Sequence, residues 1–84
     1  MEYNYITKGT CSRKITIDLD GDVIRSVKFV GGCNGNLKGV SALVKGKKAQ
    51  EVISSCKGIT CGLKPTSCPD QLALALEEAL AQQK

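Results

Sequence analysis

The cysteines are the residues of this chain best suited to chemistry. There are five of them among 84 residues, and there is no histidine. An odd number of cysteines cannot pair completely in internal disulfides. The sequence shows no basic and apolar leader and no apolar run long enough to span a membrane, so we expect a cytoplasmic protein with reduced thiols. Cysteine enrichment in that compartment favours metal or redox chemistry over a disulfide framework.

Four of the cysteines occupy similar places in the predicted structure. Cys11 lies in the turn before a strand, and Cys33 lies at the corner after another strand. Cys61 lies in a late loop, and Cys68, which precedes Pro69, is predicted to cap the last helix. Because side chains at the ends of elements can converge, these four cysteines are our candidate metal ligands.

The fifth cysteine, Cys56, has a different setting. It falls on the apolar face of a predicted helix, in phase with Val52 and Ile53. A buried cysteine behaves as a small hydrophobic residue. We therefore interpret Cys56 as part of the core.

The setting of the four candidate cysteines suits thiolates, which are the form that binds metal. Helix N-termini favour anionic groups, and neighbouring cations would offset the charge of several thiolates. Three cations lie close to these cysteines in the sequence, namely Arg13, Lys57 and Lys64. The spacing itself contains no Cys-x-x-Cys knuckle of the zinc-ribbon kind. The residues alone leave three interpretations open: a metal site, a thiol–disulfide redox site, or unrelated structural cysteines.

Several other functions lack their required residues. Without histidine, a Cys–His or Ser–His nucleophile is excluded. The glycine-rich stretch 31–35 lacks the Lys-Ser/Thr of a phosphate loop. The net charge of +4 comes from scattered lysines with few aromatics, which predicts a solvated surface and no nucleic-acid partner.

The apolar patterns predict the elements that position the cysteines. Strands are expected over 2–8, 13–19 and 23–30, because Ile15, Ile17 and Leu19 alternate with polar residues. Ile24 is out of phase, which predicts a bulge near Arg25. Helical spacing of apolar residues predicts a helix from about 37 to Gly46, a second over 47–56 and a third over 69–83. The prediction is one α+β domain, 1–84, with a three-stranded antiparallel sheet followed by three helices on one face.

The string Thr66-Ser67-Cys68-Pro69-Asp70 resembles the motif that names the TSCPD domain family. The stretches GCNGNL at 32–37 and GITCG at 58–62 also resemble its small stand-alone members with four cysteines. The likeness covers nearly the whole chain. Related domains occur at the ends of some ribonucleotide reductases, so it implies an association with that enzyme. The chain is too short to hold the catalytic barrel of a ribonucleotide reductase.

The order of elements is similar to that of the NifU-like iron–sulfur scaffold proteins. The ligand cysteines of those scaffolds match three positions here: Cys11, Cys33 and Cys68. The chain departs from that pattern, with Arg13 in place of an aspartate and Ser67 in place of a histidine. The resemblance implies that Cys61 replaces the lost ligand, which would give an all-cysteine site that holds metal firmly.

These observations together predict a small metal-binding accessory or scaffold protein that holds zinc or an iron–sulfur cluster. We expect no catalytic activity of its own. The alternative is a thiol-redox or regulatory accessory domain associated with ribonucleotide reductase. A ribonucleotide reductase or an iron–sulfur assembly protein is the expected partner, and a membrane is not.

Overall fold

The structure is a computed structural model that describes residues 2–7, 9, 12–32, 34–60, 62 and 66–82, with Ser12, Asn34 and Asn36 described by their backbone alone. Its element order is the predicted β-β-β-α-α-α. The elements are β1 (Glu2–Ile6), β2 (Ser12–Asp20), β3 (Val23–Gly31), α1 (Asn34–Val44), α2 (Ala49–Cys56) and α3 (Cys68–Gln82).

The sheet is antiparallel in the order β1-β2-β3, and one of its faces is buried. Ile17 in the central strand lies opposite Tyr3 on one side and Val27 on the other. Ile15 and Ile17 are fully buried, as the alternation predicted. Thr16 points to the other face, where its hydroxyl donates a hydrogen bond of 2.8 Å to the Asn4 side chain. The pleat therefore separates a core face from an open face.

The predicted bulge in β3 is confirmed. Asp18 pairs with Ser26 and Leu19 pairs with Ile24, so Arg25 is an extra residue in the ladder. The bulge returns Ile24 to the core face, where it is fully buried. The register shifts again at the other end of β2, between Ser12 and Lys14, and the alternation gave no sign of this second irregularity.

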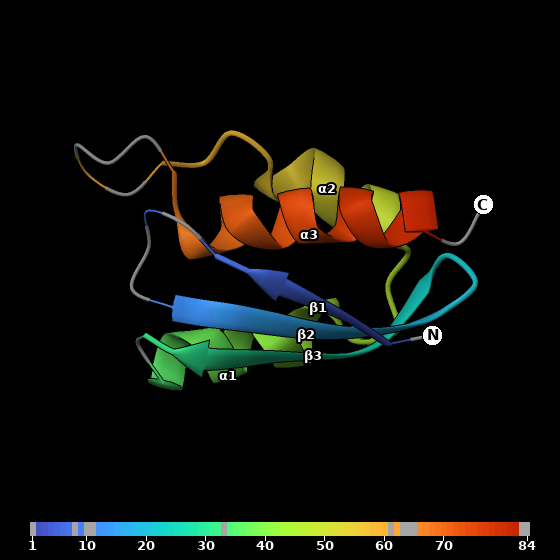
Figure 1. Cartoon of the computed structure of the whole chain (residues 1–84), viewed down its shortest axis with the longest axis horizontal. Coiled ribbons are helices and arrows are strands. Elements are labelled where there is room, and N and C mark those ends of the chain that lie inside the picture. The colour runs from blue at the N-terminus through green and yellow to red at the C-terminus, as the bar shows by residue number, and fades with distance from the viewer. Residues whose placement is uncertain are drawn as a thin grey trace.

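The helices cover the core face of the sheet (Figure 1). In this view α3 lies along β1 and β2, α1 lies along β3, and α2 lies beside α3. The fully buried core residues of largest volume come from β2, β3 and α3: Ile15, Ile17, Leu19, Ile24, Leu72 and Leu76. The core thus lies between the sheet and α3.

Backbone hydrogen bonds attach the turn between α1 and α2 to the start of β3. The Ile24 carbonyl accepts from the Gly46 N–H at 2.8 Å, and the Ile24 N–H donates to the Lys47 carbonyl at 2.9 Å. The Ala49 N–H donates to the Asp22 carbonyl at 2.7 Å. These bonds fix the α1–α2 turn at the hairpin end of the molecule, far from the start of α3 in Figure 1.

Candidate cysteine site at one end of the molecule

One of the four candidate ligands is among the described residues. Cys68 is the first residue of α3 and is half-buried. The predictions for Cys11, Cys33 and Cys61 fall outside the described residues. Over the part of the chain that is described, no group of three or more His, Cys, Asp or Glu side chains is placed to hold a metal ion. The geometry of the candidate site is therefore built from the residues that flank the cysteines.

The N-terminus of α3 is capped by Ser67, one residue before the predicted cap. The Ser67 hydroxyl accepts a hydrogen bond from the Asp70 N–H at 3.1 Å, and the Ser67 carbonyl accepts from the Gln71 N–H at 2.9 Å. This is the N-cap geometry, and a hydroxyl is a better acceptor than a thiol. Cys68 is then the first helical residue, and Pro69 is the second.

The same serine ties the preceding loop to the helix. The Ser67 hydroxyl donates to the Ile59 carbonyl at 2.6 Å while it accepts from the helix. Ile59 precedes Cys61 by two residues in the sequence. One buried side chain therefore connects the segment leading to Cys61 with the helix that begins at Cys68.

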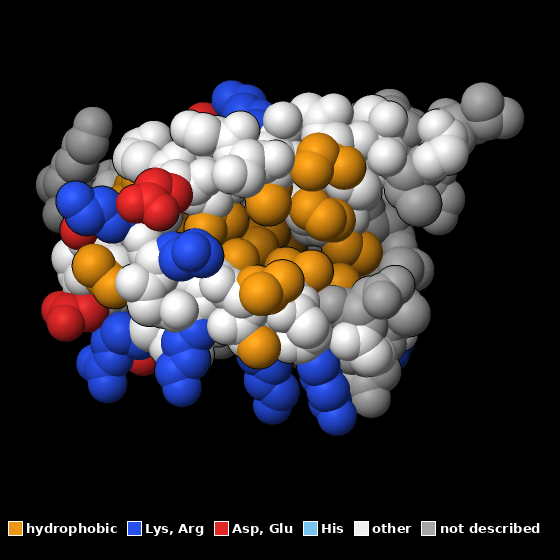
Figure 2. All heavy atoms as spheres, turned by 180° about the vertical axis from the view of Figure 1, so that it is seen from behind, with side chains coloured by type: hydrophobic (Ala, Val, Ile, Leu, Met, Phe, Trp, Pro, Cys, Tyr) orange, Lys and Arg blue, Asp and Glu red, His pale blue; other side chains and the backbone are white. Residues whose placement is uncertain are grey.

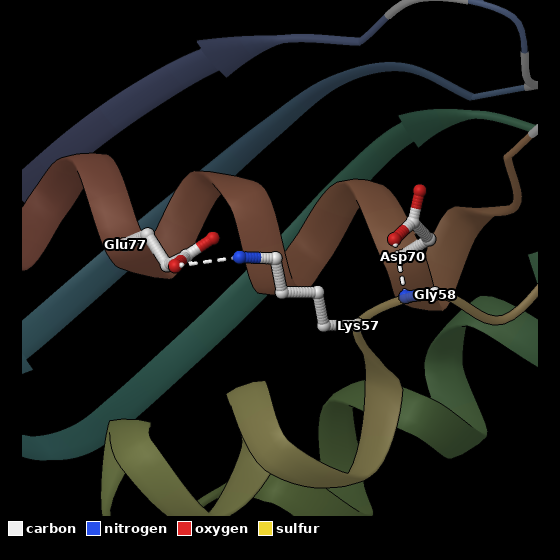
Figure 3. A network of polar contacts seen from close by, with 4 residues as sticks. All are labelled: Lys57, Gly58, Asp70 and Glu77. Atoms are coloured by element: carbon white, nitrogen blue, oxygen red, sulfur yellow. Dashed lines mark hydrogen bonds and ion pairs between the residues drawn. The ribbon is translucent and has the colours of Figure 1, made fainter.

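Asp70 makes a second connection between the same two segments. Its carboxylate accepts from the Gly58 N–H at 2.7 Å, as Figure 3 shows, and from the Thr66 hydroxyl at 2.5 Å. The Gln71 side-chain amide in turn donates to the Thr66 oxygen at 2.9 Å. The hydrogen bonds from Thr66 and Gly58 lower the pKa of Asp70, because they stabilise its charged form. Asp70 is 9% exposed, and among the described residues every buried side-chain polar atom has a hydrogen-bond partner.

Sequence reasoning missed this polar anchor, which consists of Gly58, Thr66, Ser67, Asp70 and Gln71. Part of its signal was visible, because Ser67 three residues before Asp70 is the spacing of a capping box. The hydrogen bonds to Gly58 and Ile59 cannot be predicted from the periodicity of the sequence. Three residues of the TSCPD string thus have a structural role, which is to hold the loop against the helix.

The loop between β1 and β2 also approaches the start of α3. Gly9, which precedes Cys11 by two residues, has a φ of +74°, and a Cβ built there would lie 3.0 Å from Thr66 Cγ2. The Thr7 N–H donates to the Arg13 carbonyl at 3.2 Å and closes this loop. A side chain at position 9 would be strained both by its backbone angle and by this contact.

The end of β3 lies beside the same loop. Gly31 pairs with Ser12, and a Cβ at Gly31 would lie 3.2 Å from Arg13 Nε. Gly31 has a φ of +81° and precedes Cys33 by two residues. Arg13, one of the three predicted cations, therefore lies between the segments that lead to Cys11 and to Cys33.

The other two predicted cations give a different result. The Lys57 ammonium lies 3.1 Å from Glu77 Oε2, about two turns beyond the start of α3 (Figure 3). Lys57 therefore pairs with a helix carboxylate, and its positive charge also lowers the pKa of Asp70 near the start of α3. Lys64 lies outside the described residues.

Cys56 has the role that its helical position predicted. It is half-buried and packs against the core. Burial raises the pKa of its thiol, because the thiolate would lose solvation. Cys56 is therefore a packing residue with reduced reactivity.

Comparison with known proteins gives one match. The family model of the TSCPD domain matches residues 1–80. No curated protein and no solved structure matches the chain. The likeness to NifU-like scaffolds stays a prediction. Within the described residues, no helix is both long and apolar enough to cross a membrane.

Proposed function

Since the chain belongs to the TSCPD domain family, we propose that this member is a small metal-binding accessory or scaffold protein. Its ligands would be the four cysteines at element ends: Cys11, Cys33, Cys61 and Cys68. The bound group would be a zinc ion or an iron–sulfur cluster. Neither would require a catalytic residue of this chain.

The observation that carries the proposal is that the segments flanking all four cysteines meet at one end of the molecule. A Cβ built at Gly31 would lie 3.2 Å from Arg13 Nε in β2, and a Cβ built at Gly9, between β1 and β2, would lie 3.0 Å from Thr66 Cγ2. Two residues beyond Thr66, the helix begins at Cys68, and its first turn is bonded to Gly58 and Ile59. Figure 1 shows the end of β1, the start of β2, the end of β3 and the start of α3 at the same end. Four segments distant in sequence are thus neighbours there.

The chemistry of the donor set supports a metal in preference to a lone reactive thiol. Four cysteine sulfurs are the ligand set of structural zinc sites and of common iron–sulfur clusters. Cys68 is the first residue of a helix, where the macrodipole favours an anionic ligand. Arg13 supplies a positive charge beside the flanking segments. A metal would also stabilise a chain of this size, whose core alone is small.

The accessory role rests on the family resemblance, since related TSCPD domains occur at the ends of some ribonucleotide reductases. We propose that it serves a ribonucleotide reductase or an iron–sulfur assembly protein in the cytoplasm. Under this proposal the metal site is structural or carries the cluster, and the partner performs the chemistry.

Metal analysis with a visible absorption spectrum tests the proposal, on protein purified without oxygen or chelator. We expect stoichiometric zinc, or iron together with sulfide. Cys68→Ser should lower the metal content, while Cys56→Ser, which removes a half-buried thiol outside the proposed site, should leave it unchanged. Metal-free protein whose thiols cycle to disulfides would contradict the proposal and favour the thiol-redox role.

A further inference from the structure

A groove with apolar walls runs between α1 and α2 on the helical side of the molecule. Its volume is about 340 Å³, and α1 contributes Val40 and Leu43 to it while α2 contributes Val52 and Cys56. Ile59 and Pro69 line the end nearest the start of α3. Figure 2 shows the apolar side chains gathered in a hollow in the middle of this face. The groove exists because α1 packs on β3 whereas α2 packs on α3.

Two side chains of this groove are unusually exposed for their type. Leu43 is 73% exposed and Ile59 is 44% exposed. Covering such surface yields about 25 cal/mol for each Å² removed from water. Apolar side chains that gather around a hollow are typical of binding surfaces. The groove therefore offers a partner an apolar contact that the described residues leave uncovered.

The charge of the segment from β3 to the start of α2, which includes the α1 wall of the groove, indicates the chemistry of that partner. Residues 23–50 hold six of the twelve basic residues and none of the eight acidic ones. All six basic side chains are exposed: Arg25, Lys28, Lys38, Lys45, Lys47 and Lys48. Lys47 lines the groove itself, and Glu51 is the acidic residue among its described lining residues. Figure 2 shows a row of basic side chains along one edge of the hollow.

We propose that this groove binds an acidic amphipathic helix of a partner protein. An apolar stripe at i, i+3, i+4 and i+7 would enter the groove between α1 and α2, which is the helix-in-groove mode of recognition. Carboxylates on the flanks of that helix would face Lys47 and its exposed neighbours. This interaction does not depend on the bound metal.

The observations favour this occupant over three others. A second copy of the chain would bring two basic surfaces together, which is unfavourable. Nucleic acid would want aromatic rings for base stacking, and the residues that line the groove include none. A membrane would meet a protruding apolar surface better than a hollow one. An acidic helix satisfies both the shape and the charge.

Selection from a display library of amphipathic helical peptides, with acidic, basic or neutral residues at the polar positions, tests the proposal. We expect enrichment of peptides with an acidic polar face, and we expect their affinity to fall as salt is raised. Leu43→Gln should weaken the best peptide at least tenfold. The matched control is Ile6→Gln, because Ile6 is 65% exposed in β1 and lies outside the groove. It should leave the affinity unchanged, and circular dichroism melts should show both variants folded.

Four results would overturn the proposal. The first is a selection that enriches basic peptides, or one that enriches no peptide more strongly on the wild-type protein than on the Leu43→Gln variant. The second is equal binding of the best peptide by wild type and Leu43→Gln. The third is self-association in sedimentation experiments that Leu43→Gln abolishes, which would assign the groove to a second copy. The fourth is Leu43-dependent binding to anionic lipid vesicles or to single-stranded DNA without any binding to acidic peptides.

Discussion

Helices α3 and α1 both pack on the core face of the sheet, yet they are used in different ways. Seven residues of α3 are buried, and two of them, Asp70 and Gln71, are polar and hydrogen-bonded. Among its described side chains α1 buries Leu37 and Val44, while Leu43 is largely exposed. The alanines of α3 allow close approach to the sheet. Helix α3 therefore stabilises the fold and the cysteine end, whereas α1 presents a surface.

The largest effect expected from this comparison is in the core. Leu76→Ala should cost about 2–5 kcal/mol in the free energy of unfolding, because Leu76 of α3 is fully buried in the core. Leu37→Ala in α1 should cost clearly less, since Leu37 lines an open pocket of about 370 Å³ between α1 and β3. Urea denaturation of both variants measures the difference. Equal losses of unfolding free energy in the two variants would contradict the difference that we infer between α3 and α1.

The next effect concerns the charge of Asp70. Because its pKa is lowered in the folded protein, its carboxylate stabilises the fold fully above the unfolded-state pKa of about 4. That contribution is lost as the pH falls through the folded value. Asp70→Asn should cost about 1.5–3 kcal/mol at pH 7, since two hydrogen bonds lose their charged acceptor. The variant should be less sensitive than wild type to acid between neutral pH and pH 3, and an unchanged acid sensitivity would contradict the role of Asp70.

A smaller effect compares one serine in each helix. Ser67→Ala removes the N-cap of α3 and leaves the Ile59 carbonyl without its hydroxyl donor, so it should cost about 1 kcal/mol or somewhat more. Ser41 in α1 donates to the Leu37 carbonyl four residues earlier, a bond that contributes little to a helix. Ser41→Ala should therefore be nearly neutral. Thermal melts of both variants at matched protein concentration measure the two losses. A larger loss of stability in Ser41→Ala than in Ser67→Ala would contradict this prediction.

The smallest effect is expected at the most exposed position. Leu43→Gln should change the free energy of unfolding by no more than about 0.5 kcal/mol, because Leu43 is mostly in water already. Chemical denaturation is the measurement. A loss as large as that of Leu37→Ala would show that Leu43 contributes to the fold and that α1 is less of a surface than we infer.

The fold was predictable where local pattern and burial agree. The alternation of Ile15, Ile17 and Leu19 located β2, and the misplaced Ile24 located the bulge at Arg25. β1 ends at Ile6, earlier than predicted. The predicted N-cap, Cys68, is one residue too late, because the Ser67 hydroxyl accepts the hydrogen bond that caps the helix.

The candidate site was predictable only in part. The family string and the placement of the cysteines at element ends pointed to the end of the molecule where their flanking segments meet. The contacts that bring these segments together join residues distant in sequence, such as Gly58 with Asp70 and Gly9 with Thr66. Periodicity carries no information on such pairs. The metal itself stays a prediction for all four cysteines.

The hydrogen bond of 2.8 Å from the Tyr3 hydroxyl to Glu78 joins the first strand to the last helix. It brings the two ends of the fold together, on the side opposite the cysteine end in Figure 1. A short linker could therefore join the two ends. The fold is thus suited to circular permutation, or to insertion as a module within a loop of a host protein, with the cysteine end directed away from the host.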